Sequence, residues 1–82
     1  MNEVTIQFFA SLKDDVGKRN IQLAIPSVTT VGELKELLIH TYPSLSRTQK
    51  TMMSAVNREY AGDEEVVPLH AEIAFFPPVS GG

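Results

Sequence analysis

The sequence TVGELKELLIHTYP at residues 30–43 predicts the one substantial helix of the chain. Thr30 and Glu33 fit a capping box, in which two residues satisfy each other's unpaired backbone donors. The apolar residues at helical spacing are Val31, Leu34, Leu37, Leu38 and Tyr42, and Glu33, Lys35 and Glu36 are expected on the solvent side. The helix should stop at Tyr42-Pro43, because a residue that precedes proline is disfavoured in the helical conformation.

Strand patterns flank this helix on both sides. Residues 4–9 (VTIQFF) and 21–25 (IQLAI) alternate with period two, which places Val4, Ile6 and Phe8 on one face. Residues 13–18 form a turn or short helical turn between these strands, so an N-terminal hairpin is expected. After the helix come a polar connector (44–51), a strand candidate of unassigned parity (52–57), a turn with room for a short strand around Val66 and Val67 (60–69), and a last strand (72–76).

The element order is therefore β-β-α-β-(β)-β within 82 residues. One helix and four or five strands predict an α+β domain, in which the helix packs on one face of a mixed sheet. The β-grasp, or ubiquitin-like, fold has this order. We assign residues 1–77 to a β-grasp domain and residues 78–82 to an extended C-terminal tail.

Composition and charge exclude several classes of function. The chain is 43% hydrophobic and 21% charged, as expected for a soluble globular domain. Its net charge of -3 and its scattered basic residues argue against nucleic acid as a partner. It has no cysteine, which excludes disulfides, thiolate metal sites and cysteine nucleophiles. It also lacks a signal-peptide pattern and a membrane-spanning stretch, so we expect a cytoplasmic protein with no membrane partner.

The remaining polar residues form no catalytic motif. His40 and His70 share no metal-ligand spacing, so no metal site is expected. Asp14-Asp15 and residues 63–65 (DEE) are interpreted as solvated turns, although the second run is also suited to meet basic residues on a partner. Phosphate-binding loops and nucleophile elbows are absent from the sequence. The chain is therefore not expected to be an enzyme by itself.

The C-terminal segment is the most informative part of the sequence. It reads Pro77-Pro78-Val79-Ser80-Gly81-Gly82 and follows the last predicted strand directly. The prolines favour an extended path and reduce the entropy lost when the segment enters a channel, and the glycines permit close backbone approach. A carboxylate is a poor electrophile and must first be activated, typically as an acyl-adenylate. This tail therefore predicts a terminal carboxyl group that is presented to partner enzymes.

Residues 75–82 (FFPPVSGG) resemble the ending of the small subunit of molybdopterin synthase. Two triplets, Phe8-Phe9-Ala10 and Ala55-Val56-Asn57, resemble the same family, and the likeness covers essentially the whole chain in length and element order. One departure lies before the last strand. The family often has Gly-Asp-Glu there, whereas this chain has His70-Ala71-Glu72.

The resemblance implies a sulfur-carrier cycle. A ubiquitin-activating-type enzyme would adenylate Gly82 with ATP, and a sulfur donor protein would convert the adenylate to a thiocarboxylate. The tail would then enter the large catalytic subunit, where the terminal sulfur attacks a cyclic pterin monophosphate precursor to build the molybdopterin dithiolene. The family assembles as a heterotetramer of two small and two large subunits. The chain itself is expected to bind no cofactor.

Three aromatic residues are predicted to dock these partners. Phe9 and Phe76 lie on strand faces opposite the predicted core, and Tyr60 is placed with them; exposed aromatic rings are natural anchors for a protein partner. Two other functions fit a Gly-Gly ending: a sulfur carrier for another pathway of the thiamine thiazole type, and a ubiquitin-like modifier joined to lysines by isopeptide bonds. The Pro-Pro-Val tail favours the molybdopterin synthase carrier.

Overall fold

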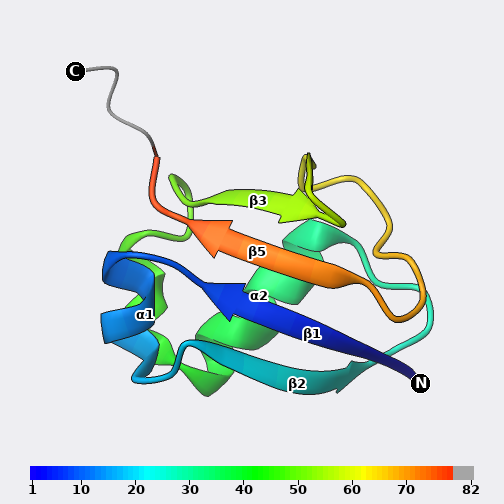
Figure 1. Cartoon of the computed structure of the whole chain (residues 1–82), viewed down its shortest axis with the longest axis horizontal. Helices are drawn as coiled ribbons and strands as arrows, with labels where there is room; N and C mark the ends of the chain where they lie inside the picture. The colour runs from blue at the N-terminus through cyan, green and yellow to red at the C-terminus, as the bar shows by residue number, and fades with distance from the viewer. Residues whose placement is uncertain (79–82) are drawn as a thin grey trace.

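The computed structural model describes residues 1–78. A mixed sheet lies across one main helix, α2, as the sequence predicted (Figure 1). The elements are β1 (Asn2–Phe8), α1 (Ser11–Val16), β2 (Asn20–Ile25), α2 (Val31–Thr41), the 3-10 helix η1 (Pro43–Arg47), β3 (Met53–Val56), β4 (Glu59–Tyr60) and β5 (Glu72–Phe76). The strand order is β2-β1-β5-β3-β4, with β1 and β5 parallel and the other neighbours antiparallel.

The core lies between the sheet and α2, and the predicted alternation of β1 fills it. Val4, Ile6 and Phe8 are buried, and Ile73 and Phe75 of β5 are buried beside them. The helix contributes Val31, Leu34 and Leu38 from its inner stripe. Each such side chain contributes about 1.5–3 kcal/mol by leaving water. The N-terminal hairpin is also confirmed, because β1 and β2 pair in antiparallel register.

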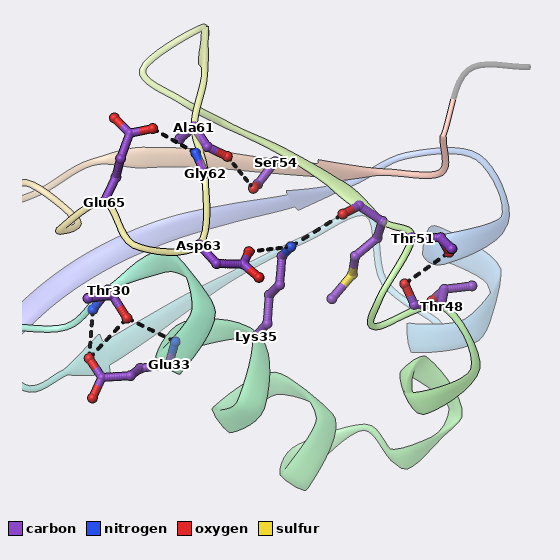
Figure 2. Close-up of polar contacts among 11 residues, drawn as sticks. Thr30, Glu33, Lys35, Thr48, Thr51, Ser54, Ala61, Gly62, Asp63 and Glu65 are labelled. Carbon is purple, nitrogen blue, oxygen red and sulfur yellow. Dashed lines mark hydrogen bonds and ion pairs between the residues drawn. The ribbon is translucent and has the colours of Figure 1, made fainter. Parts of the chain in front are cut away.

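The first turn of α2 holds the loop at residues 61–67 in place. Thr30 and Glu33 form the predicted capping box, with Glu33 N–H donating to Thr30 Oγ1 at 3.2 Å and Thr30 N–H donating to Glu33 Oε1 at 2.9 Å (Figure 2). The next donors reach the loop: Val31 N–H bonds Glu65 O at 2.8 Å, and Gly32 N–H bonds Asp63 O at 2.9 Å. Gly32 permits this approach, because a Cβ there would lie 3.2 Å from Asp63 Cβ.

The capping box gives the chain a defined acid sensitivity. Hydrogen bonds from the Thr30 backbone and then its side chain lower the pKa of Glu33 below its ordinary value of 4.5. A lowered pKa in the folded state contributes stability above the unfolded pKa, and this stability is lost as the pH falls through the folded pKa. We expect the free energy of unfolding to fall below about pH 4.5, and Glu33→Gln, which keeps the cap but does not titrate, to fall less steeply. Urea titrations of both chains across this range measure the difference, and equal slopes would contradict it.

Lys35 is buried, and its predicted place on the solvent side is therefore wrong. Its relative exposure is 7%. The ammonium group donates to Asp63 Oδ1 at 2.7 Å and to the Met52 carbonyl at 3.3 Å, joining α2 to the loop and to the start of β3 (Figure 2). Helical spacing does not predict this burial, because a lysine stem packs against apolar neighbours while its charged end reaches a partner. Asp63 keeps 63% of its side chain exposed, so it is both a solvated turn residue and the lysine's counterion.

We expect Asp63→Ala to lower the free energy of unfolding by about 1–3 kcal/mol, because a buried ammonium group would keep only a carbonyl partner. Lys35→Met fills the same volume without a charge and should cost less than about 1.5 kcal/mol. Chemical denaturation of the two variants and of the double variant tests this order. A larger cost for Lys35→Met would show that the bond to the Met52 carbonyl, rather than the ion pair, supplies most of the stabilisation.

Three further predictions are wrong. Leu37 is 42% exposed, because the buried stripe of α2 runs through Leu34 and Leu38 and leaves Leu37 at its margin. The connector at 44–51 includes part of η1, whose Leu45 is fully buried and therefore belongs to the core. The short fourth strand is β4 rather than the segment at Val66, which makes only an isolated bridge to Thr30.

A two-residue turn explains the position of β4. Asn57 and Arg58 link β3 to β4 with φ angles of 50° and 73°, the left-handed region that the common type I′ hairpin turn requires. Asparagine adopts this conformation readily, whereas arginine does so rarely. Arg58 stands where glycine usually follows asparagine in such a turn. The sequence therefore gives no Asn-Gly signal for this hairpin.

The turn before β5 keeps a left-handed backbone without glycine. His70 has a φ of 57° at the position where the family often has glycine. The Asn2 side chain secures the turn, because its Oδ1 accepts from His70 N–H at 2.8 Å and its Nδ2 donates to Pro68 O at 2.9 Å. These two bonds offset the steric cost that a side chain brings to this backbone conformation.

Candidate functional site

The base of the tail is anchored in the middle of the sheet. β5 pairs with β1 on one side and β3 on the other, and Phe75 is fully buried near its end. Phe9 N–H donates to Phe75 O at 3.1 Å, which extends the β1–β5 pairing to this point. Pro77 has no N–H and cannot continue the ladder, so the chain leaves the sheet after Phe76. This exit lies at the same end of the sheet as α1 (Figure 1).

The structure describes the C-terminal segment as far as Pro78. Pro77 is half-buried and Pro78 is exposed. Val79, Ser80, Gly81 and Gly82 lie outside the described residues, so their predicted roles stay predictions.

The open face of the sheet carries an apolar cluster beside this exit. We define the open-face cluster as Phe9, Met53, Tyr60 and Phe76. Met53 pairs with Phe76 across β3 and β5, and the rings of Tyr60 and Phe76 meet edge-on with centroids 5.9 Å apart. The exposed fractions are 72% for Tyr60, 47% for Phe9 and 39% for Met53, and Phe76 is half-buried.

The three predicted docking aromatics therefore come from β5, β4 and the residue after β1, on one side of the molecule. Small side chains lie beside the Tyr60–Phe76 contact, because Ala55 of β3 pairs with both Ala74 and Tyr60. Alanine side chains are short, so they leave the rings accessible to a partner. Their docking role stays a prediction.

Sequence reasoning missed Met53. In residues 52–57 both alternating sets mix apolar and small residues, so neither set is marked as the outer face. Only the pairing with Phe76 shows that Met53 points to the open side while Ser54 is buried. Exposed methionine beside aromatic rings suits an adaptable protein interface.

The geometry around the cluster favours a protein partner over a small molecule. The hollow beside Phe9 has a volume of about 150 Å³, below the roughly 300–1,000 Å³ typical of ligand pockets. Within residues 1–78, no three His, Asp or Glu side chains gather closely enough to hold a metal ion. Nor does any helix in that range have the length and apolar character needed to cross a membrane.

Comparison with known proteins places this site in a family. The model of the ThiS family matches residues 6–82. The chain belongs to the ThiS family. The molybdopterin synthase sulfur carrier subunit of Caenorhabditis briggsae is 40% identical over 84 aligned residues that cover 100% of both chains. The resemblance that the tail and the two triplets indicated is therefore confirmed.

Solved structures of similar proteins confirm the β-grasp fold. The crystal structure of SAMP1 from Haloferax volcanii has a TM-score of 0.85 and 29% identity, and the match covers 99% of this chain and 100% of that one. One chain from the complex of subunits 1 and 2 of the molybdopterin-converting factor of Helicobacter pylori has a TM-score of 0.66 and 21% identity, covering 98% and 99%. At that identity the second likeness concerns the fold alone.

Proposed function

We propose that this protein is the sulfur-carrier subunit of a molybdopterin synthase. The observation that carries the proposal is the 40% identity to such a subunit across the full length of both chains. The anchored tail base and the exposed open-face cluster support it, because a carrier must present one end of its chain while its body is held by a partner.

The proposed chemistry takes place at the carboxyl group of Gly82. A carboxylate oxygen attacks the α-phosphorus of ATP on an activating enzyme, and pyrophosphate leaves. Sulfur at the oxidation level of sulfide, supplied by a donor protein, then attacks the acyl carbon and displaces AMP, which leaves a thiocarboxylate. In the large subunit this sulfur bonds to a carbon of a cyclic pterin monophosphate precursor and displaces an oxygen substituent, and water then hydrolyses the resulting thioester, which leaves the sulfur on the precursor and releases the Gly82 carboxylate. Two such transfers supply both sulfurs of the dithiolene.

The role of the folded body is positioning. Phe75 and the strands on both sides of β5 fix the point from which the tail departs. The open-face cluster supplies apolar area next to that point, where a partner that binds the tail also has to contact the body. Binding energy from such a surface helps to hold the reacting end in place.

Intact-mass measurement tests this chemistry directly. The purified chain is mixed with ATP, an activating enzyme and a sulfur source, and we expect a mass gain equal to the replacement of one oxygen by sulfur. Adding the large subunit and the cyclic precursor should return the original mass and yield the dithiolene product. Thiocarboxylate formation without transfer to that precursor would instead assign the chain to another pathway, such as thiamine thiazole synthesis.

A second candidate is a protein modifier, which the similarity to SAMP1, a small archaeal modifier protein, favours. In that case Gly82 would form isopeptide bonds to lysines of other proteins. A blot of cell extract against a tagged chain distinguishes the two functions. A ladder of heavier conjugates supports the modifier, and a single band at the mass of the chain supports the carrier.

A further inference from the structure

β2 forms a long and unprotected edge of the sheet. It is the outermost strand on one side, six residues long, whereas β4 on the other side has two residues (Figure 1). Proteins usually protect an exposed edge with a lysine, a proline, a bulge or a very short strand. The sequence of β2, NIQLAI, contains no charged residue and no proline. The edge therefore retains the features that permit another strand to pair with it.

The hydrogen-bond register shows which backbone groups face outward. Phe8 N–H donates to Arg19 O at 2.9 Å, so odd-numbered residues of this segment exchange hydrogen bonds with β1. In an antiparallel pair these positions alternate, which turns the N–H and C=O groups of Asn20, Gln22 and Ala24 toward the open edge. The spacing of these backbone groups suits hydrogen bonding to one extended segment.

A groove with a mixed apolar and polar lining runs beside the same edge, on the side of the sheet that faces α2, and Lys18, Asn20, Gln22 and Thr41 supply its polar part. Ile21 and Leu23 of β2 and Tyr42 after α2 are partly buried against the core, and they line a groove of about 270 Å³ together with Leu38. A strand added to β2 would place every second side chain over this groove. It would also complete the burial of Ile21 and Leu23.

The charges at the start of β2 indicate the chemistry of the occupant. Lys13, Lys18 and Arg19 are exposed around one hollow there, and Lys18 also lines the groove. Asp14 is the acidic residue among them, and neighbouring Asp15 lies 3.8 Å from Arg47. This corner is therefore basic in a chain whose net charge is -3.

We propose that the β2 edge binds an extended segment of a partner protein, in which aliphatic residues alternate with polar ones and acidic residues flank them. The segment adds a strand to β2, inserts its aliphatic side chains between β2 and α2, and meets Lys18 with its acidic end. β1 separates this edge from β5, and the groove lies between β2 and the end of α2, whereas Arg19 and Asn20 at the start of β2 also line the hollow beside Phe9.

The test uses a fluorescent peptide in which valines alternate with threonines between aspartates at both ends. We expect saturable binding by fluorescence anisotropy, together with amide shifts and slower hydrogen exchange at Asn20, Gln22 and Ala24. A control peptide with proline in place of each valine should not bind. Shifts confined to the open-face cluster, or no binding up to the solubility limit of the peptide, would overturn the proposal.

Two variants locate the site. Gln22→Pro removes one outward N–H and leaves the β1–β2 bonds intact, so affinity should fall by about tenfold or more, while Gln22→Thr should bind normally. Lys18→Glu should weaken binding about three- to tenfold at low salt, and Lys50→Glu, which lies outside the groove lining, should not. Unchanged affinity in folded Gln22→Pro and Lys18→Glu would refute edge pairing. Sedimentation of the free chain as a dimer joined through β2 would assign the edge to a second copy instead.

Discussion

Removal of Gly82 should reduce thiocarboxylate formation by about 100-fold or more and leave the free energy of unfolding unchanged. The reacting carboxyl group would sit one residue closer to the sheet, and misplacement of a reacting atom by even ~1 Å costs about 100-fold in rate. The last strand ends at Phe76, so the deleted residue lies beyond the strands and helices that build the core. Intact mass measures the reaction, and urea titration measures the fold.

A second variant makes this result specific to position. One alanine added after Gly82 keeps both glycines and moves the carboxyl group outward, and it should fail as the deletion does. The activating enzyme must modify a known carrier in the same reaction mixture. Normal sulfur loading of the deleted chain would refute the requirement for a carboxyl group at the Gly82 position, because with no cysteine in the chain the sulfur would then be held by the new terminal carboxyl group of Gly81.

Most of the fold follows from local patterns in the sequence. The capping box, the proline after Tyr42 and the alternation in β1 each depend on neighbouring residues, and the structure confirms all three. The tail was informative for a different reason: it combines residue types with known effects on backbone freedom. Of the C-terminal segment 77–82, the structure describes Pro77 and Pro78.

The errors arose where distant segments meet. Lys35 is buried because Asp63 and the Met52 carbonyl approach it, and neither contact is visible from helical spacing. Met53 faces the open side because of its pairing with Phe76, a residue 23 positions away by sequence number. The same limitation explains why the sequence identified Phe9, Tyr60 and Phe76 as members of the open-face cluster but not Met53.

Two adjacent phenylalanines should separate stability from partner binding. Phe75 is fully buried, so Phe75→Ala should lower the free energy of unfolding by about 3–5 kcal/mol, a large share of the stability of a small domain. Phe76 points to the open face and meets Tyr60. Phe76→Ala should cost less, about 1–3 kcal/mol of stability, because the half-buried ring loses its contact with Tyr60 and part of its burial.

For the affinity of a partner protein, Phe76→Ala should have the larger effect of the two substitutions. With the large subunit of molybdopterin synthase as the proposed partner, Phe76→Ala should weaken binding by about 1–3 kcal/mol, in the range of an interface hot spot. Val28→Ala is the matched control, because Val28 is 76% exposed but lies outside the open-face cluster, and its affinity should not change. Calorimetry on folded variants measures both affinities. If Phe76→Ala binds normally and Val28→Ala does not, the large subunit contacts the helix side, and the anchored tail must reach it around the edge of the sheet.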